Sequence, residues 1–224
     1  MIKVCAVLHR RPGLGVDEFQ SYWRTTHAAL VSSVPGIRRY VQSHPLPGGY
    51  RRGQLPFDGL AEIWVDDTDA LRAMATTSEL AVVRRDEPNF LDTERMFELI
   101  VDEEVVKEGP AAPVKSIELV IFRADLPVEE ARRYWREVHG PIAAAIGPVR
   151  RYVQSHVRPG AYRRPERPPC DGLATTWFDS VDAMRQSART DEYARTRADE
   201  ANFLAPGNPP IVLATEVVVV AARR

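Results

Sequence analysis

Two histidines in equivalent positions are the residues of this sequence best suited to chemistry. His27 ends the segment YWRTTH and His139 ends the segment YWREVH, so that a tyrosine, a tryptophan and a histidine recur at the same spacing. An imidazole has an ordinary pKa of about 6.5 and can give or take a proton near neutral pH. We therefore expect His27 and His139 to be catalytic. The alternative is a buried histidine that bonds a carbonyl or a tyrosine hydroxyl, and a duplication would preserve that role too.

A second set of polar residues follows in the segment IRRYVQSH. Tyr40, Gln42 and His44 share one face of the expected strand, because strand side chains alternate. We treat His44 as a further catalytic candidate. Its counterpart His156 is taken as a substrate-binding residue, provided that this face looks towards the helices.

Carboxylates that could orient a catalytic histidine are less evenly shared between the two halves. Asp86 recurs in the second half, whereas Glu62 is replaced there by Thr175 and Asp92 by Ala205. A carboxylate inside a strand is costly unless it is paired or used. We therefore expect Glu62 or Asp86 to act with His27, and we expect the first half to keep more of the catalytic parts. A solvent-facing Glu62 on an edge strand is the alternative.

Aromatic and amide side chains near these groups could line a site for a flat or hydrophobic substrate. A role in the core is the alternative for the large aromatic residues. The expected substrate-binding residues are Tyr22, Trp23, Tyr40, Gln42, Trp64, Tyr134, Trp135, Gln154 and His156.

Hydrophobic periodicity places these residues on strands and helices. We predict strands over residues 2–9, 37–44, 60–66 and 96–106, and helices over residues 17–34 and 69–85, the second interrupted near residues 76–78. His27 then falls on the apolar stripe of the first helix, at α-helical spacing from Trp23 and Leu30. Each half therefore has the order β-α-β-β-α-β, which is the ferredoxin-like arrangement with both helices on one face of an antiparallel sheet.

The second half repeats the first at an offset of 112 residues, which becomes 113 after Cys170. This predicts two duplicated domains, residues 1–108 and 115–224, joined by a linker at residues 109–114. Each unit would leave one sheet face bare. We therefore expect an α+β fold in which the two repeats pack sheet to sheet as an intramolecular α/β barrel.

Composition excludes several classes of function. The net charge of -1 gives no overall attraction to nucleic acid, and no apolar run reaches the roughly 20 residues that cross a bilayer. The first residues do not resemble a secretory signal, so we expect a cytoplasmic protein. The two cysteines do not match in the repeat, and the histidines lack metal-ligand spacing, so we predict neither a disulfide nor a metal.

Four motifs together resemble the EthD family of the dimeric α/β-barrel superfamily. They are EFxxYWxxxH at residues 18–27, PGIRRYVQ at residues 35–42, DGLAEIWVD at residues 58–66 and DExNFxD at residues 86–92. The resemblance covers nearly all of each half. It implies a pocket between the helices and the sheet of each half, and a tandem form of a domain that usually dimerises. Further homodimerisation stays open.

The resulting hypothesis is a cofactor-independent lyase or isomerase acting on a small hydrophobic carbonyl, phenolic or polyketide-like compound. His27 would move a proton beside a carbonyl, with Glu62, Asp86 or His44 orienting it. Two alternatives stay open: a non-catalytic binding protein of a catabolic pathway, and an oxygenase that is cofactor-free or haem-dependent.

Overall fold

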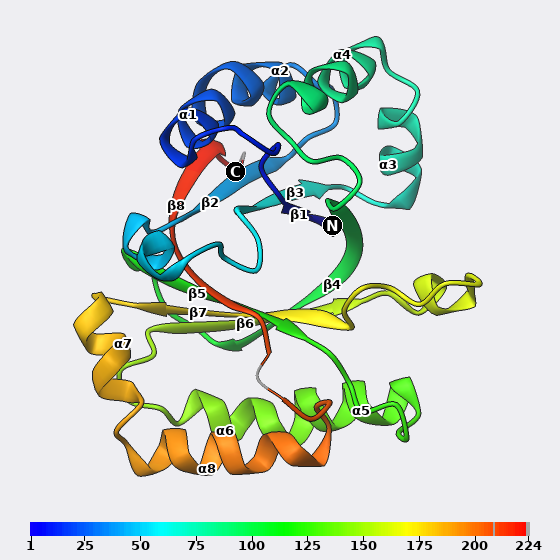
Figure 1. Cartoon of the computed structure of the whole chain (residues 1–224). Coiled ribbons are helices and arrows are strands. Elements are labelled where there is room, and N and C mark those ends of the chain that lie inside the picture. The colour runs from blue at the N-terminus through cyan, green and yellow to red at the C-terminus, as the bar shows by residue number, and fades with distance from the viewer. Residues whose placement is uncertain (208, 223–224) are drawn as a thin grey trace. The chain divides into compact units, whose positions relative to one another are not determined.

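The computed structural model describes residues 1–207 and 209–222 and divides them into two compact units (Figure 1). One unit holds Met1–Val101 with the C-terminal residues from Glu216, and the other holds Asp102–Thr215. The predicted second domain runs to residue 224, and residues 208, 223 and 224 lie outside the described residues. The predicted linker at residues 109–114 falls largely between two strands. The units divide earlier, after residue 101, because two strands each contribute residues to both units.

The elements follow the predicted order in both halves. The first half contains β1 (Ile2–Leu8), α1 (Val16–Tyr22), η1 (Trp23–His27), α2 (Ala28–Ser32), β2 (Arg39–Pro45), η2 (Pro47–Arg52), β3 (Gly59–Val65), α3 (Thr68–Met74), α4 (Ser78–Asp86), η3 (Glu87–Asn89) and β4 (Phe97–Lys107). The second contains β5 (Val114–Val120), α5 (Val128–Tyr134), η4 (Trp135–His139), α6 (Gly140–Ala144), β6 (Arg151–Val157), η5 (Pro159–Arg163), β7 (Gly172–Phe178), α7 (Val181–Ser187), α8 (Asp191–Asp199), η6 (Glu200–Asn202) and β8 (Ile211–Val220). The predicted interruption between the two later helices of the first half is confirmed, because α3 and α4 are separate.

The strands pair antiparallel within each half. β1 pairs with β3 and β4, and β3 also pairs with β2. β5 pairs likewise with β7 and β8, and β7 with β6. The complete hydrogen-bonding order, β1-β3-β2-β8-β5-β7-β6-β4, is that of a closed barrel. The predicted fold class, an α+β barrel of two βαββαβ repeats, is confirmed.

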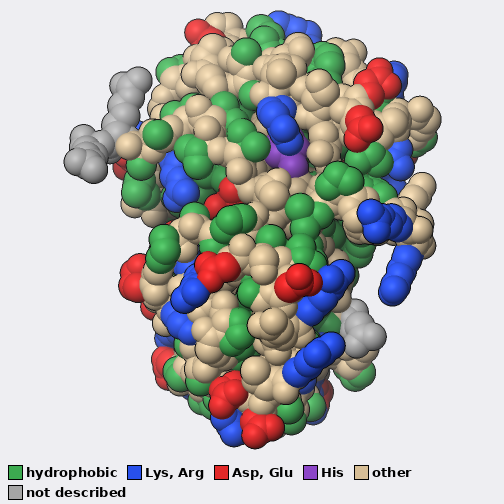
Figure 2. Space-filling view, turned by 90° about the vertical axis from the view of Figure 1, so that its left-hand side faces the viewer, with side chains coloured by type: hydrophobic (Ala, Val, Ile, Leu, Met, Phe, Trp, Pro, Cys, Tyr) green, Lys and Arg blue, Asp and Glu red, His purple; other side chains and the backbone are tan. Residues whose placement is uncertain are grey.

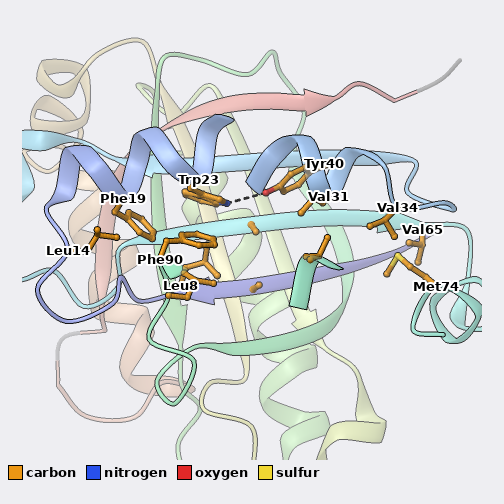
Figure 3. Close-up of a cluster of buried hydrophobic side chains, with 14 of the residues drawn as sticks. Leu8, Leu14, Phe19, Trp23, Val31, Val34, Tyr40, Val65, Met74 and Phe90 are labelled. Atoms are coloured by element: carbon orange, nitrogen blue, oxygen red, sulfur yellow. Dashed lines mark hydrogen bonds between the residues drawn. The ribbon is translucent and has the colours of Figure 1, made fainter. Parts of the chain in front are cut away.

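The core of the first unit lies where the helices cover the sheet (Figure 3). Phe19 and Trp23 from the first helical segment pack with Tyr40 of β2 and with Phe90, and all four side chains are buried. Truncation of a buried aromatic residue of this kind typically costs about 3–5 kcal/mol. The aromatic side chains around the first histidine are thus part of the core, which was the alternative to a substrate-binding role.

Gly59, in the DGLA motif, is needed because Trp23 lies directly on the strand. A Cβ atom at Gly59 would come within 2.5 Å of the Trp23 ring, and one at Gly172 would come within 2.7 Å of the Trp135 ring. The close approach of a ring to the backbone is the physical reason for the glycine at both positions.

The prediction that the first helix of each half is one continuous α-helix is wrong. η1 and η4 are π-helical turns of five residues each, inserted between two short α-helices. In each turn a backbone N–H bonds the carbonyl five residues earlier, Ala28 to Trp23 and Gly140 to Trp135. π-Turns of this kind are rare and occur often at functional sites.

Cys5 and Cys170 are both buried and unbridged, as expected of small apolar residues. None of the helices in the described part of the chain has the length and apolar character needed to cross a membrane.

Candidate functional site

A histidine, a carboxylate, a phenol and an amide come together at the π-turn of the first unit. Nδ1 of His27 lies 2.8 Å from Oδ2 of Asp86, which is the last residue of α4. The other oxygen of Asp86 accepts hydrogen bonds from the Tyr22 hydroxyl at 2.5 Å and from the Asn89 amide at 3.0 Å. The carboxylate is therefore held by three donors, and it holds one nitrogen of the imidazole ring.

The π-turn is what allows Tyr22 and His27 to reach the same carboxylate. The two residues are five positions apart, and in an α-helix of about 3.6 residues per turn they would point in different directions. A π-turn closes its hydrogen bond over five residues, so the two side chains return to one face. The α-helical spacing predicted that His27 lies on the apolar face of the helix, but it did not predict that Tyr22 shares the same carboxylate.

The surroundings of His27 favour a neutral imidazole. Burial lowers the pKa of His27, and the nearby Arg84 lowers it further, while the hydrogen bond and charge of Asp86 act in the opposite direction. Burial raises the pKa of Asp86, but hydrogen bonds from Tyr22, His27 and Asn89 outweigh it, so the pKa of Asp86 lies below its ordinary value. An ionised Asp86 places the ring proton on Nδ1. Nε2 of His27 then carries the lone pair and can act as a base.

The second unit repeats the arrangement. Nδ1 of His139 lies 2.8 Å from Oδ2 of Asp199, and the other oxygen accepts from Tyr134 at 2.7 Å and from Asn202 at 3.0 Å. Burial again lowers the pKa of His139, opposed by Asp199. Both halves thus contain a complete histidine–aspartate pair.

Gln42 and His44 belong to a second, buried network on the strand face that looks towards η1. The Gln42 amide donates to the carbonyl of Trp23 at 2.9 Å and to the Tyr40 hydroxyl at 2.8 Å, and its oxygen lies 2.9 Å from Nε2 of His44. The Trp23 indole donates to the same hydroxyl at 3.1 Å (Figure 3). These contacts show that the Tyr40–Gln42–His44 face does look towards the helices.

The second unit has the matching network of Trp135, Tyr152, Gln154 and His156. His156 is as closely tied to Gln154, at 2.9 Å, as His44 is to Gln42. In each unit the glutamine amide therefore donates a hydrogen bond to the backbone carbonyl of the first residue of the π-turn.

Glu62 and Trp64 lie away from the histidine–aspartate pair. On β3, Ala61, Ile63 and Val65 pack into the helix-covered core, so the alternating Glu62 and Trp64 face the opposite side of the sheet. Glu62 there forms a buried ion pair with Lys3 at 2.8 Å, and the Lys3 ammonium lies 5.1 Å from the centre of the Trp64 ring. Of the three groups proposed to orient His27, the structure brings only Asp86 to it.

Asn89 and Phe90 are site residues that the sequence analysis did not single out. The Asn89 amide holds Asp86, and the Phe90 ring lies 4.6 Å from the His27 ring, centre to centre. In the second unit Phe203 lies 4.7 Å from His139. The recurring DExNF motif was the available signal, because it keeps the aspartate, the asparagine and the phenylalanine together.

No three histidine, cysteine, aspartate or glutamate side chains come close enough to hold a metal ion within residues 1–207 and 209–222. The side chains that surround the pair of His27 and Asp86 are instead a phenol, an amide and an aromatic ring.

The model of the EthD domain matches residues 11–94 and 123–207. No curated protein matched the chain.

Several solved structures share the fold at low sequence identity. An anthrone oxidase-like protein is 11% identical, with 99% of this chain and 94% of that chain covered and a TM-score of 0.67. A protein from Lactobacillus acidophilus NCFM, proposed to be a monooxygenase, is 10% identical, with coverage of 97% and 94% and a TM-score of 0.59. A mutant chlorite dismutase from Candidatus Nitrospira defluvii is 12% identical, with coverage of 97% and 92% and a TM-score of 0.52. At these identities the likeness establishes the fold alone. Because the domain model matches most of both repeats, the chain belongs to the EthD family and carries two EthD domains in tandem.

Proposed function

We propose that His27 and His139 each remove a proton from a carbon beside a carbonyl group in a small hydrophobic compound, without a cofactor. The observation that carries this proposal is the bond between Nδ1 of each histidine and a carboxylate, at 2.8 Å in both units. A carboxylate on Nδ1 fixes the tautomer and stabilises the imidazolium that forms when Nε2 takes up a proton. Lowered histidine pKa values keep this base in its unprotonated form at neutral pH.

Each residue around the base has a physical role in this step. Asp86 stays ionised through its hydrogen bonds to Tyr22 and Asn89, so its charge faces the ring when the proton arrives. The Phe90 ring excludes water from one side of the imidazole. Positioned general bases of this type contribute roughly 10²- to 10⁴-fold in rate.

The fate of the resulting enolate defines the reaction class. In a lyase or isomerase the imidazolium returns the proton to a leaving group or to another carbon of the same molecule. We favour this class because the proton then travels from substrate to Nε2 and back, and no further reactant is needed.

A cofactor-free oxygenase is the second candidate, and it shares the first step. The support for it is the likeness to an anthrone oxidase-like protein at a TM-score of 0.67. Anthrone is itself a carbonyl compound whose methylene carbon lies across the central ring from the carbonyl, and loss of a proton from that carbon gives an enolate delocalised through the aromatic rings. In this mechanism the enolate left by proton removal reacts with dioxygen.

A haem between the π-turn and the sheet does not fit the residues present. Trp23 and Trp135 are buried against strand glycines so closely that even a methyl group would collide with the rings. We therefore derive no haem-dependent step for either unit.

Anthrone in heavy water tests the shared step and separates the two classes. Under argon, the wild-type protein is expected to accelerate the loss of the methylene proton signal of anthrone by deuterium exchange, as followed by proton NMR. In air, dioxygen uptake above the uncatalysed rate would identify the oxygenase, and exchange without uptake would favour the lyase or isomerase. No exchange above the buffer rate would argue for a protein that binds such compounds without turning them over.

A further inference from the structure

Two glutamates of the second unit share one arginine. Glu118 lies on β5, and Glu200 is the first residue of η6. The guanidinium of Arg197, on α8, lies 2.8 Å from Oε1 of Glu200 and 3.7 Å from Oε1 of Glu118. The side chains of Glu200, Glu118 and Arg197 are only 14%, 20% and 29% exposed. One guanidinium therefore faces two carboxyl groups in a region where water screens charge weakly.

Glu118 belongs to the helix-covered face of β5. Val120, two residues later, is part of the buried hydrophobic cluster of this unit, and strand side chains alternate, so Glu118 faces the same side. Ala174, which lies opposite Glu118 on β7, packs against that cluster too. The equivalent position of the first half is Ala6, in the core of the first unit. The second unit therefore has a carboxyl group on a surface that is apolar in the first.

The Glu118–Arg197–Glu200 cluster changes its charge near neutral pH. A single guanidinium cannot neutralise two carboxylates, so ionisation of the second one is opposed. Burial raises the pKa of Glu200 to about 7, and the charge of Glu118 is the next largest cause; Arg197 acts against this rise, and Asp199 adds to it. Burial also raises the pKa of Glu118, again against the effect of Arg197.

Other charged or titratable groups face this cluster from neighbouring elements. Both glutamates act on Tyr152 of β6, and Arg197 acts on His139 of η4. Burial raises the pKa of Tyr152 and lowers the pKa of His139, so both side chains are uncharged at neutral pH. Arg123, which follows β5, donates to a carbonyl within η6 and pairs with Asp125. The two glutamates are therefore the groups of the cluster that respond to pH in this range.

The first unit has a related cluster with a different balance of charge. Arg84 bonds Glu87 and Glu98 at 2.9 Å each, but Glu98 lies on β4, opposite Ala6, and is 39% exposed. Water screens such exposed charges, and acidic and basic side chains are intermixed over the face shown in Figure 2. Burial raises the pKa of Glu87, and the opposing charge of Arg84 outweighs the repulsion from Glu98. In the second unit that order is reversed, because the repulsion from Glu118 outweighs the attraction to Arg197.

η6 connects this cluster to the histidine–aspartate pair of the second unit. Glu200 directly follows Asp199, which holds Nδ1 of His139 at 2.8 Å and accepts from Asn202 at 3.0 Å. The N–H of Phe203, whose ring lies against His139, donates to the carbonyl of Glu200 at 3.1 Å. A change of charge at Glu200 thus acts within one turn of the residues that orient the imidazole.

We propose that Glu118, acting through Arg197 and Glu200, makes the geometry of the His139–Asp199 pair sensitive to pH near neutrality, a property that the first unit lacks. Glu118 is therefore a positioning residue. With Glu200 protonated, Arg197 balances Glu118 and η6 stays in place; with both ionised, the carboxylates repel each other and η6 loosens. Because the folded site favours the protonated form, its stabilising effect is complete below the ordinary pKa of 4.5 and is lost as the pH rises through about 7.

Amide hydrogen exchange of the full chain at pH 5 and pH 8, corrected for the intrinsic effect of pH, tests this proposal. In the wild type, the Phe203 amide should lose roughly tenfold in protection relative to the Phe90 amide, since each pKa unit recovered on opening is a factor of ten. The Phe90 N–H donates to the Glu87 carbonyl at the equivalent place in the first unit, so it is the matched internal control. Neither signal depends on turnover, so the result stands apart from the proposed proton transfer.

Three variants identify the group responsible. In Glu118→Gln, which keeps the shape and removes the charge, the protection ratio should become independent of pH, and the Glu200 carboxyl resonance should titrate at a lower pH than in the wild type. Glu118→Ala, which introduces the residue of the first unit, should behave alike and guards against an effect of the new amide. Glu98→Gln should leave the wild-type ratio unchanged. A wild-type ratio that is equal at both pH values, or a change that persists in both Glu118 variants, would overturn the proposal.

Discussion

At the scale of single residues, the proposed catalysis depends on a carboxylate that orients the imidazole ring and stabilises its protonated form. Asp86 raises the pKa of His27 against the stronger effect of burial. Replacing the carboxylate by an amide of the same shape removes the charge and leaves the ring in place.

The variant Asp86→Asn is expected to lower the pKa of His27 still further. The double variant Asp86→Asn, Asp199→Asn should lose about 10²-fold in proton-transfer rate, because the imidazolium is no longer stabilised. NMR titration of the His27 ring measures the first effect, and His139 in the single variant is the control. An unchanged titration of His27 would show that Asp86 does not govern it.

The two buried histidines of the second network predict a stability that falls in acid. Their folded-state pKa of about 3 lies below the unfolded value of 6.5, so protonation favours the unfolded chain. The stability is present above pH 6.5 and is lost as the pH falls towards about 3. In this window each histidine should lower the free energy of unfolding by about 1.4 kcal/mol for each unit by which the pH falls.

Urea unfolding at pH 7 and pH 5 measures that loss. From pH 7 to pH 5 the free energy of unfolding of the wild type should fall by about 4 kcal/mol more than that of the variant His44→Gln, His156→Gln. This variant retains the other titrating groups. Equal losses in the two proteins would mean that these rings are not neutral in the folded state.

The sequence predicted the residues of the site better than their grouping. His27, Asp86 and Tyr22 were all named from their types and recurrence, and the structure joins them. Glu62 was also expected beside His27, but strand alternation puts it on the other face of β3, with Lys3. The packed fold decides which face of a strand is buried against the helices. The local sequence around Glu62 does not predict that face.

At the scale of elements, the π-turn is the feature that sequence periodicity could not reveal. Apolar spacing predicted a continuous helix over residues 17–34, and the strands and later helices lie close to their predicted ranges. One inserted residue per helix leaves the apolar pattern nearly unchanged. The contact that stabilises the π-turn is the hydrogen bond from the Gln42 amide of β2 to the Trp23 carbonyl, and Gln42 is distant from η1 in sequence.

The variant Gln42→Leu is expected to loosen η1. It removes the side-chain donor to the Trp23 carbonyl, a backbone acceptor that also bonds the Ala28 N–H. Exchange of the Ala28 amide proton should become roughly tenfold faster, and the His27 bond to Asp86 should weaken, as seen in the Nδ1 proton signal. The Gly140 amide of the second unit, supported by Gln154, is the matched control. Equal exchange at Ala28 before and after the substitution would contradict this role.

At the scale of the whole molecule, the duplication leaves two complete histidine–aspartate pairs. The sequence comparison had favoured chemistry in the first half, because Glu62 and Asp92 have no counterparts. The structure places Glu62 away from the pair, and Asp199, Tyr134 and Asn202 complete the second one. The fold and the tandem repeat could be predicted because hydrophobic periodicity and matching motifs recur along the whole chain.

Two equivalent pairs make a quantitative prediction for single and double variants. Deuterium exchange of the anthrone methylene under argon reports the proton-transfer step independently of the later fate of the enolate. The variants His27→Gln and His139→Gln should each retain about half of the wild-type exchange rate, and the double variant should fall to the buffer rate. His9→Gln, at a histidine outside both pairs, should exchange like the wild type. A folded double variant that still exchanges anthrone at the wild-type rate would contradict the assignment of His27 and His139 as the bases.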